Sequence, residues 1–272
     1  RVASRGLGDV YKRQITAKLA LELKVVGLIN LQFAVKDDKV YVLEVNPRSS
    51  RTVPFVSKYS NVPLANIAAQ ISVGKSLNDF KLKESNFEHY AVKKAVLPFK
   101  KFKDEKVFLG PEMKSTGEVM GIDMSTGSAF LKAMKSDGYN VPKQGTAFLS
   151  VNKTDRAGLV QIAKNLMGLG FNLVATKGTS RFLNEQGILC DDMFKVGEGR
   201  PNVVDEILND NIQLVINTPE GPQSRFDEEA IGKTSVMKNI LTITTLSGAR
   251  AAIDSMKHLN KISVKALQEY FK

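Results

Sequence analysis

The stretch LINLQFAVKDDKVYVLEVN, residues 28–46, contains two runs of strand-forming residues separated by a charged tetrapeptide. The runs at 28–35 and 40–46 predict two strands, and the KDDK between them predicts the turn of an antiparallel hairpin. Pro47 ends the second strand, because proline cannot continue a central ladder of hydrogen bonds. The first structured part of the chain is therefore expected to be built around a two-stranded ribbon.

Three polar side chains of this hairpin are expected to converge. With residues 37–39 as the turn, Gln32 lies opposite Glu44, and Asn46 shares their face because side chains alternate along a strand. One carboxylate and two amides supply the hard oxygen ligands that suit Mg²⁺, whose coordination is commonly completed by substrate phosphates. The hairpin is therefore a candidate metal site.

Two arginines follow the second strand directly. Arg48 and Arg51 are suited to bidentate contacts with phosphoryl oxygens. A carboxylate–amide cation site beside two arginines is typical of phosphoryl transfer from ATP, in which catalysis is mostly positioning and electrostatics. The alternative is that Glu44 and Asn46 form only the polar face of an edge hairpin, and the spacing leaves both interpretations open.

The segments around the hairpin carry further signals of helix and sheet. We expect helices at 15–24, 64–73 and 126–136, a strand at 91–97 and further sheet within 109–121. Residues 1–14 show no clear period and begin without methionine. We interpret them as a non-native or unmatched segment that stands outside the fold.

The pattern of strand and helix signals changes after the segment GYNVPKQG at 138–145. Such a cluster of Gly, Asn, Pro and Gln is typical of a domain boundary. Short strands then alternate with helices of about ten residues, which predicts βαβ units on a parallel sheet. The strands are expected at 146–151, 171–175 and 212–216, and the helices at 155–168, 179–186, 203–209 and 247–257. The second domain is therefore expected to be an α/β domain.

Composition narrows the classes of function. The 272 residues are 43% hydrophobic and 25% charged, as in globular proteins, and no apolar run reaches the length of a membrane span. One cysteine, Cys190, and two histidines make a His/Cys metal site improbable. The net charge of +11 is diffuse, which suits anionic small molecules better than nucleic acid. We expect a cytoplasmic protein that binds neither nucleic acid nor membranes.

A candidate anion site lies at one edge of the predicted parallel sheet. Ligands bind beyond the carboxyl ends of parallel strands, and helix N-termini favour anions. One strand runs into Thr176-Lys177-Gly178-Thr179 and another ends at Asn217-Thr218, while Arg156 and Lys195 lie within reach of the same edge. The alternative is an ordinary turn in which Thr179 caps the following helix, and the residues alone favour that simpler interpretation.

The run EVNPRSSRTVPFVSK at 44–58 resembles the metal- and ATP-binding segment of ATP-grasp ligases. Together with GKSL at 74–77, VLPF at 96–99 and LGPEMKSTGEVMG at 109–121, it is similar to the carbamoyl-phosphate synthetase large chain. The resemblance extends from Ile15 to the C-terminus. It implies the C-terminal part of an ATP-grasp domain over 15–138, followed over 139–272 by a doubly wound parallel α/β regulatory domain that resembles methylglyoxal synthase.

The resemblance also implies an activity. In this family the second ATP-grasp half uses ATP and Mg²⁺ or Mn²⁺ to phosphorylate carbamate to carbamoyl phosphate, which supplies pyrimidine or arginine biosynthesis. Gln32 and Glu44 match ligands of ATP and metal, Asn46 matches a metal ligand, and Glu44 would bridge two metal ions. Arg51 matches a base that holds the phosphorylated intermediate, and Arg48 lies beside it.

Partners follow from the same resemblance. The family's enzyme hydrolyses glutamine on a separate glutaminase small chain, and the full-length enzyme is expected to be an oligomer. The remainder of the ATP-grasp unit is expected upstream of Ile15, so we do not expect this polypeptide to turn over alone. The alternative is a non-catalytic regulatory module that binds an effector and acts through a partner chain.

The regulatory site is implied residue by residue. Thr176, Thr179, Lys195 and Asn217 match the family's effector phosphate site, and Arg156 keeps the charge of a lysine there. We therefore expect an anionic effector of the nucleotide type.

Some positions depart from the family's patterns. Pro219 and Pro222 replace a hydroxyl residue and an arginine of nucleotide-binding members. Lys94 and Thr242 stand where ornithine-binding members carry an acidic residue and a tyrosine, although Thr244 is kept. A positive Lys94 would repel the cationic amino group of ornithine, which argues against ornithine as the effector. The acidic catalytic residues of true methylglyoxal synthases have no match at this edge, which argues against lyase activity.

Overall fold

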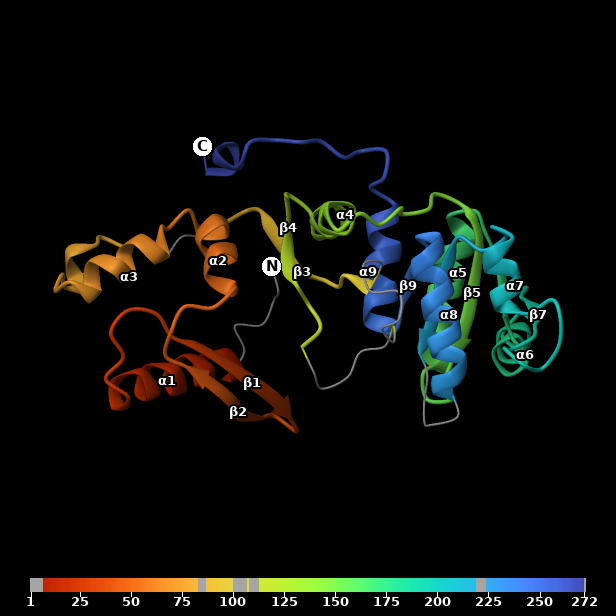
Figure 1. Ribbon diagram of the computed structural model, residues 1–272, viewed down its shortest axis with the longest axis horizontal. Helices are drawn as coiled ribbons and strands as arrows, with labels where there is room; N and C mark the ends of the chain where they lie inside the picture. The colour runs from red at the N-terminus through yellow and green to blue at the C-terminus, as the bar shows by residue number, and fades with distance from the viewer. Residues whose placement is uncertain (1–6, 83–86, 100–106, 108–112, 219–223, 272) are drawn as a thin grey trace. The chain divides into compact units, whose positions relative to one another are not determined.

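The computed structural model describes residues 7–82, 87–99, 107, 113–218 and 224–271 (Figure 1). The chain divides into two compact units, one within residues 1–87 together with 265–272 and the other within 88–264. Pro219, Pro222 and the segment 109–112 lie outside the described residues. Among the helices that are described, none combines the length and the apolarity that a bilayer crossing requires.

The described part of the first unit contains one hairpin, three α-helices and two 3₁₀ turns. Its elements are α1 (Leu7–Glu22), β1 (Asn30–Lys36), β2 (Lys39–Asn46), α2 (Thr52–Ser60), α3 (Leu64–Ser72) and the 3₁₀ turns η1 (Leu77–Asp79) and η3 (Leu267–Phe271). The ring of Phe87 lies 4.9 Å from that of Tyr59 and 6.2 Å from that of Phe271. These aromatic contacts attach the last residues of the chain to the first unit.

Helix α1 begins eight residues before the expected start at Ile15. The sequence DVYKRQ contains no helix breaker, so the helix extends backwards through it. Lys12 forms an ion pair with Asp9 at 3.2 Å, and the Thr16 hydroxyl donates to the Lys12 carbonyl at 2.7 Å. Residues 7–14 are thus helical, and the non-native origin of residues 1–14 stays a prediction.

Gln32 pairs with Glu44 as predicted, whereas the turn is one residue shorter than predicted and the pairing from Phe33 to Lys36 differs accordingly. The turn contains two residues, Asp37 and Asp38, both with positive φ (49° and 58°), as a type I′ turn requires. This shorter turn alone would place Gln32 opposite Leu43. The register shifts between Gln32 and Phe33, so that Gln32 faces Glu44. A bulge in β2 therefore restores the predicted pairing of Gln32 with Glu44.

The second unit begins with an antiparallel pair, β3 (Tyr90–Val96) and β4 (Gly117–Asp123), followed by α4 (Thr126–Ser136). A five-stranded parallel sheet with strand order β7-β6-β5-β8-β9 follows. Its elements are β5 (Gly145–Val151), α5 (Arg156–Gly168), β6 (Phe171–Thr176), α6 (Lys177–Glu185), β7 (Asp191–Met193), α7 (Val203–Leu208), β8 (Leu214–Thr218), α8 (Ser224–Lys238), β9 (Leu241–Ile243) and α9 (Leu246–Met256). The predicted α/β class and doubly wound parallel sheet are confirmed.

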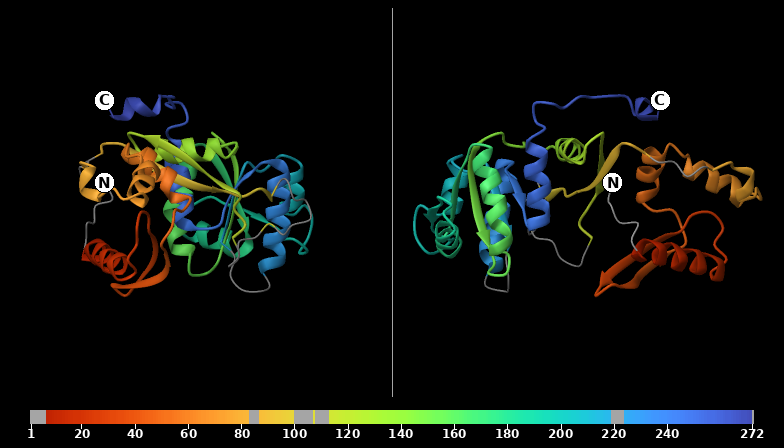
Figure 2. Two further views of the ribbon diagram at one scale, coloured as in Figure 1. Left: turned by 60° about the vertical axis from the view of Figure 1, so that its left-hand side comes forward. Right: turned by 180° about the vertical axis from the view of Figure 1, so that it is seen from behind.

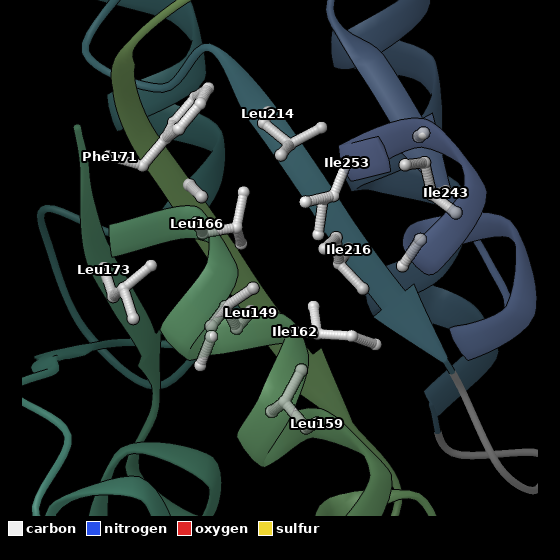
Figure 3. Close-up of a cluster of buried hydrophobic side chains, with 14 of the residues drawn as sticks. Leu149, Leu159, Ile162, Leu166, Phe171, Leu173, Leu214, Ile216, Ile243 and Ile253 are labelled. Atoms are coloured by element: carbon white, nitrogen blue, oxygen red, sulfur yellow. The ribbon is translucent and has the colours of Figure 1, made fainter. Parts of the chain in front are cut away.

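Helices cover both faces of the parallel sheet (Figures 1 and 2). On one face Leu149 packs in a cluster with Leu159, Ile162 and Leu166 of α5 (Figure 3). On the other face Phe148 packs with residues of α7 and α8. Strands buried on both faces carry nearly continuous apolar runs, which explains the sequence TAFLSV in β5.

Residues 88–136 belong to the same compact unit as the parallel sheet. The sequence pattern instead predicts a domain boundary near residue 138. Helix α4 packs on β3, β4 and α9. A Cβ on Gly121 of β4 would lie 1.9 Å from the Ala129 carbonyl oxygen, so strand and helix backbones touch there. The domain limits of 15–138 and 139–272 stay predictions.

Gly121→Ala should destabilise the second unit by about 3 kcal/mol, because the new methyl group has no room between the two backbones. Urea unfolding followed by circular dichroism would measure the loss. Gly117→Ala is the matched control in the same strand, since nothing lies within 4 Å of its added Cβ. Equal midpoints for the two variants would contradict the close packing.

Cys190 is buried, and its backbone amide and carbonyl both bond to the side chain of Asn184. Burial, with the nearby Asp191 and Asp192, raises the pKa of its thiol to about 12. At pH 8 the reactive thiolate should be about a thousandfold scarcer than in an exposed cysteine. Labelling with a thiol reagent should be slow for the folded chain and fast in urea, and rapid labelling of the folded chain would contradict this burial.

Candidate functional site

The hairpin brings its predicted polar residues onto one face. Asn46 donates from Nδ2 to Oε1 of Glu44 at 2.7 Å, and Arg48 donates from Nη2 to Oδ1 of Asn46 at 3.3 Å. Gln32 lies directly opposite Glu44. The side chains of Gln32, Glu44 and Arg48 are exposed, and Asn46 is half-buried. The face is therefore open to a ligand.

Asn30 belongs to the same face but was not singled out from the sequence. It lies opposite Asn46, two residues before Gln32. The pairing rule that aligns Gln32 with Glu44 also aligns Asn30 with Asn46, so the signal was present in the sequence. The hairpin thus carries one carboxylate and three amides on one face.

This donor set fits a hard cation that retains water or phosphate ligands. Among the described residues, no group of three or more His, Cys, Asp or Glu side chains is arranged to hold a metal ion. A cation at the hairpin would therefore be held by the single carboxylate of Glu44 with amide oxygens. Such sparse coordination suits Mg²⁺, which prefers to keep waters or substrate phosphates.

Arg51 stands at the N-cap of α2 and is exposed. Arg48 is connected to Asn46 twice, since its backbone N–H also donates to the Asn46 carbonyl at 2.8 Å. The loop between β2 and α2 thus holds Arg48 beside the hairpin face. The phosphate-binding role of both arginines stays a prediction.

The second unit contains a cavity of about 360 Å³. It opens beyond the carboxyl ends of β5, β6 and β8, where the strand order reverses on either side of β5 and where α/β sheets commonly bind ligands. All five residues predicted for the effector site line this cavity: Arg156, Thr176, Thr179, Lys195 and Asn217. The structure thus brings the predicted residues together.

Some hydrogen-bond donors of the described residues that line the cavity have no partner. Nε of Arg156 is buried without a hydrogen-bond partner among the described residues. A Cβ on Gly178 would lie 2.7 Å from Nη2 of Arg156, so the guanidinium rests against bare backbone. Helix α6 starts at Lys177, and the N–H groups of its first turn have no partner within the helix. These groups make the cavity suited to an anion.

The two threonines are connected to the sheet. The Thr176 hydroxyl bonds to that of Thr179 at 3.4 Å, and the Val151 N–H donates to Oγ1 of Thr179 at 3.4 Å. Both threonines are buried. Thr176, rather than Thr179, is the N-cap residue of α6, although neither side chain caps the helix. The interpretation of Thr179 as a capping residue is therefore wrong.

One acidic residue of the cavity was not anticipated. Asp227 of α8 lines it together with Lys195. Burial raises the pKa of the Asp227 carboxyl above its ordinary value, while Lys195 opposes the rise and Glu198 adds to it. The sequence alone did not indicate it, because only the packing of α8 in three dimensions brings Asp227 to the cavity.

Lys94 has a different environment from the one expected. It forms an ion pair with Asp137, and its Nζ lies 4.6 Å from the ring centre of Tyr139. Its positive charge is therefore balanced within the second unit. Because Asp137 balances the charge of Lys94, repulsion by Lys94 is a weaker argument against a cationic ligand than the sequence suggests.

Two families match parts of the chain. Residues 10–80 match the Carbamoyl-phosphate synthase L chain, ATP binding domain, and residues 158–244 match the MGS-like domain. The first match contains the hairpin, and the second contains most of the parallel sheet. The chain thus joins a segment similar to part of an ATP-binding domain to a segment similar to an MGS-like domain.

The relatives make the assignment more specific. Carbamoyl phosphate synthase large chain from Acidobacterium capsulatum is 50% identical over 94% of this chain and 24% of its own length. The large chain, C-terminal section, from Aquifex aeolicus is 44% identical over 98% of this chain and 54% of its own length. Methylglyoxal synthase from Elizabethkingia anophelis NUHP1 aligns with 48% of this chain and 93% of its own, with TM-score 0.36 and 19% identity.

The sequence identity confirms the resemblance: the chain is homologous to part of the carbamoyl phosphate synthase large chain. It spans about a quarter of the full-length relative and about half of the separate C-terminal section.

Gly178→Ala should weaken the binding of inorganic phosphate to the chain about tenfold, because the added methyl group would push the Arg156 guanidinium away from the cavity. Titration calorimetry would measure the affinity. Gly168→Ala, at the far end of α5, is the control, since nothing lies within 4 Å of its added Cβ. Unchanged affinity in Gly178→Ala would show that Arg156 does not contact the anion.

Proposed function

We propose that the chain serves as the C-terminal part of the large chain of a glutamine-hydrolysing carbamoyl phosphate synthase. In this role the first unit takes part in the ATP-dependent phosphorylation of carbamate to carbamoyl phosphate, and the second unit binds a regulatory anion. The observation that carries the proposal is the presence of both family matches in one chain that is 50% identical, over 94% of its length, to a carbamoyl phosphate synthase large chain.

The hairpin supplies the residues for Mg²⁺–ATP. Glu44 provides the negative charge that attracts the cation, and the amides of Gln32 and Asn46 provide further oxygen ligands on the same face. The cation, when bound, neutralises phosphate charge during phosphoryl transfer. Mn²⁺ has similar ligand preferences and would occupy the same site.

The two arginines act on the phosphoryl group. Arg48 is held beside the hairpin by its bonds to Asn46, and Arg51 stands at the N-cap of α2. Both carry fixed positive charge at any physiological pH. Their proposed role is to orient the transferred phosphoryl group and to balance the charge that develops on its oxygens.

Regulation is assigned to the second unit. Arg156, Lys195, Asn217 and the two threonines would hold the phosphate of a nucleotide-type effector in the cavity. The remaining partners, namely the glutaminase small chain and further copies of the full-length enzyme in the cytoplasm, follow from the same proposal. So does the dependence of turnover on the rest of the ATP-grasp unit.

A second candidate function is a non-catalytic effector-binding module that acts through a partner chain. One observation favours it: every lining residue of the cavity lies between Phe148 and Ile231, within one compact unit. Effector binding would therefore not need the hairpin. Both proposed functions allow the second unit to bind the effector in the same cavity.

Glu44→Gln should abolish the formation of carbamoyl phosphate in a full-length large chain that carries this sequence as its C-terminal part. The substitution keeps the shape of the side chain but removes the charge that holds the cation. The assay measures ATP-dependent carbamoyl phosphate synthesis with the small chain present. Glu22→Gln, an exposed carboxylate of α1, is the control. Wild-type turnover in Glu44→Gln would refute the metal assignment.

A further inference from the structure

The last residues of the chain belong to the first unit, although they follow the second unit in the sequence. The first unit comprises residues 1–87 and Lys265–Lys272, so the chain leaves it after Phe87 and returns to it at Lys265. The ring of Phe271 then meets that of Phe87, with their centres 6.2 Å apart and their planes at 84°. The residue at which the chain leaves the first unit is therefore held by the segment that returns to it.

Phe87 connects this contact to helix α2. Its ring lies 4.9 Å from that of Tyr59, with the two planes inclined at 59°. Both spacings fall in the range in which aromatic rings attract each other. Tyr59 stands in the last turn of α2, and Arg51 stands at the N-cap of the same helix. Because the turns of a helix are hydrogen-bonded to one another, the placement of Tyr59 helps to set that of Arg51.

Few contacts with a core fix α2. All nine of its residues are described, and none of them is buried. Helices in proteins are held mainly by the packing of an apolar face, so a helix without buried residues depends more strongly on each contact at its surface. The contact between Tyr59 and Phe87 is one of these.

The segment that carries Phe271 is ordered by its own hydrogen bonds. The Ala266 N–H donates to Oε2 of Glu269 at 2.6 Å, and the Glu269 N–H donates to the Ala266 carbonyl at 3.0 Å. These reciprocal bonds close the start of η3, which ends at Phe271. Residues 263–266 lead into the turn and are exposed, whereas Ile262 packs against the core of the second unit. The segment is thus anchored at both ends.

We propose that the C-terminal segment, residues 263–271, positions α2 and thereby Arg51 for phosphoryl transfer, with Phe271 as the positioning residue. Phe271 holds Phe87, Phe87 holds Tyr59, and α2 carries this placement to its N-cap. This inference rests on the proposed phosphoryl-transfer function of the first unit. It adds a dependence on residues that lie outside the segment 10–80 matched to the ATP-binding domain.

The test uses a full-length large chain that carries this sequence as its C-terminal part. The assay measures the transfer of the phosphoryl group from carbamoyl phosphate to ADP, which is the reverse of the proposed step. In this direction the bond between phosphorus and the carbamate oxygen breaks, a bond to the terminal phosphate oxygen of ADP forms, and the products are carbamate and ATP. The assay thus isolates the step in which Arg51 is proposed to act.

Phe271→Ala should lower kcat about tenfold and leave the KM for ADP within about twofold, because a displaced Arg51 orients the phosphoryl group less well. Phe271→Tyr keeps the ring and should retain the kcat of the wild type. Phe271→Leu removes the ring but keeps an apolar side chain, and it should lower kcat about threefold. Gln268→Ala, at an exposed position of the same turn, is the control and should not change kcat.

A second background separates positioning of Arg51 from a general loss of structure. In a chain that already carries Arg51→Lys, the geometry that Phe271 maintains has lost its purpose, so Phe271→Ala should lower kcat by at most about twofold more. A purely structural role would give the same relative loss in both backgrounds. Circular dichroism verifies that each variant folds, and Phe271→Leu serves if Phe271→Ala does not.

The outcomes distinguish the two levels of inference. If the wild type transfers no phosphoryl group, the proposed function and the positioning role both fail. If the wild type is active and the folded Phe271→Ala or Phe271→Leu chain keeps its kcat, the function stands and the positioning role is overturned. Equal relative losses with arginine and with lysine at position 51 would also overturn it, because Phe271 would then act independently of Arg51.

Discussion

Burial of β5 on both faces is the constraint on which the second unit depends. Ala147, Phe148 and Leu149 have no exposed surface, and neighbouring residues of this strand belong to opposite layers of the core. Helices must cover both faces, and the chain must cross from one side of β5 to the other to build the sheet. Because of this crossing, the connections leave β5 and β8 in opposite directions, and their carboxyl ends lie uncovered between the N-terminal ends of the helices. The cavity is therefore a consequence of how the core is filled.

The first unit depends on a more local constraint. A tight two-residue turn sets one register near the tip of the hairpin, and a bulge sets another near its open end. Without the bulge, Gln32 and Glu44 would face opposite sides, since a shift of one residue reverses the direction of every side chain. The candidate metal site thus exists because one strand carries one residue more than its partner.

Sequence patterns predicted the elements with strong periods and missed those without. The strands at 145–151 and 171–176 and the helix at 126–136 were found because their apolar spacing is regular. Strands β7 and β9 have three residues each, too few for any period. Helix α8 buries Thr234 and Ser235, so its inward face is not purely apolar. Helix α2 is rich in Val, Phe and Tyr, which favour strands. Site residues next to strand ends could be predicted, whereas Asp227 required the three-dimensional packing of α8.

The contact between Arg156 and Gly178 makes the two positions dependent on each other. A guanidinium is broad and flat, and here it occupies the space that any side chain at 178 would need. The compact ammonium of a lysine at 156 would leave part of that space free. A chain that exchanged its arginine for lysine could therefore accept alanine or serine at 178 directly, whereas here the guanidinium would have to move aside, so the order in which such replacements accumulate depends on shape rather than on charge.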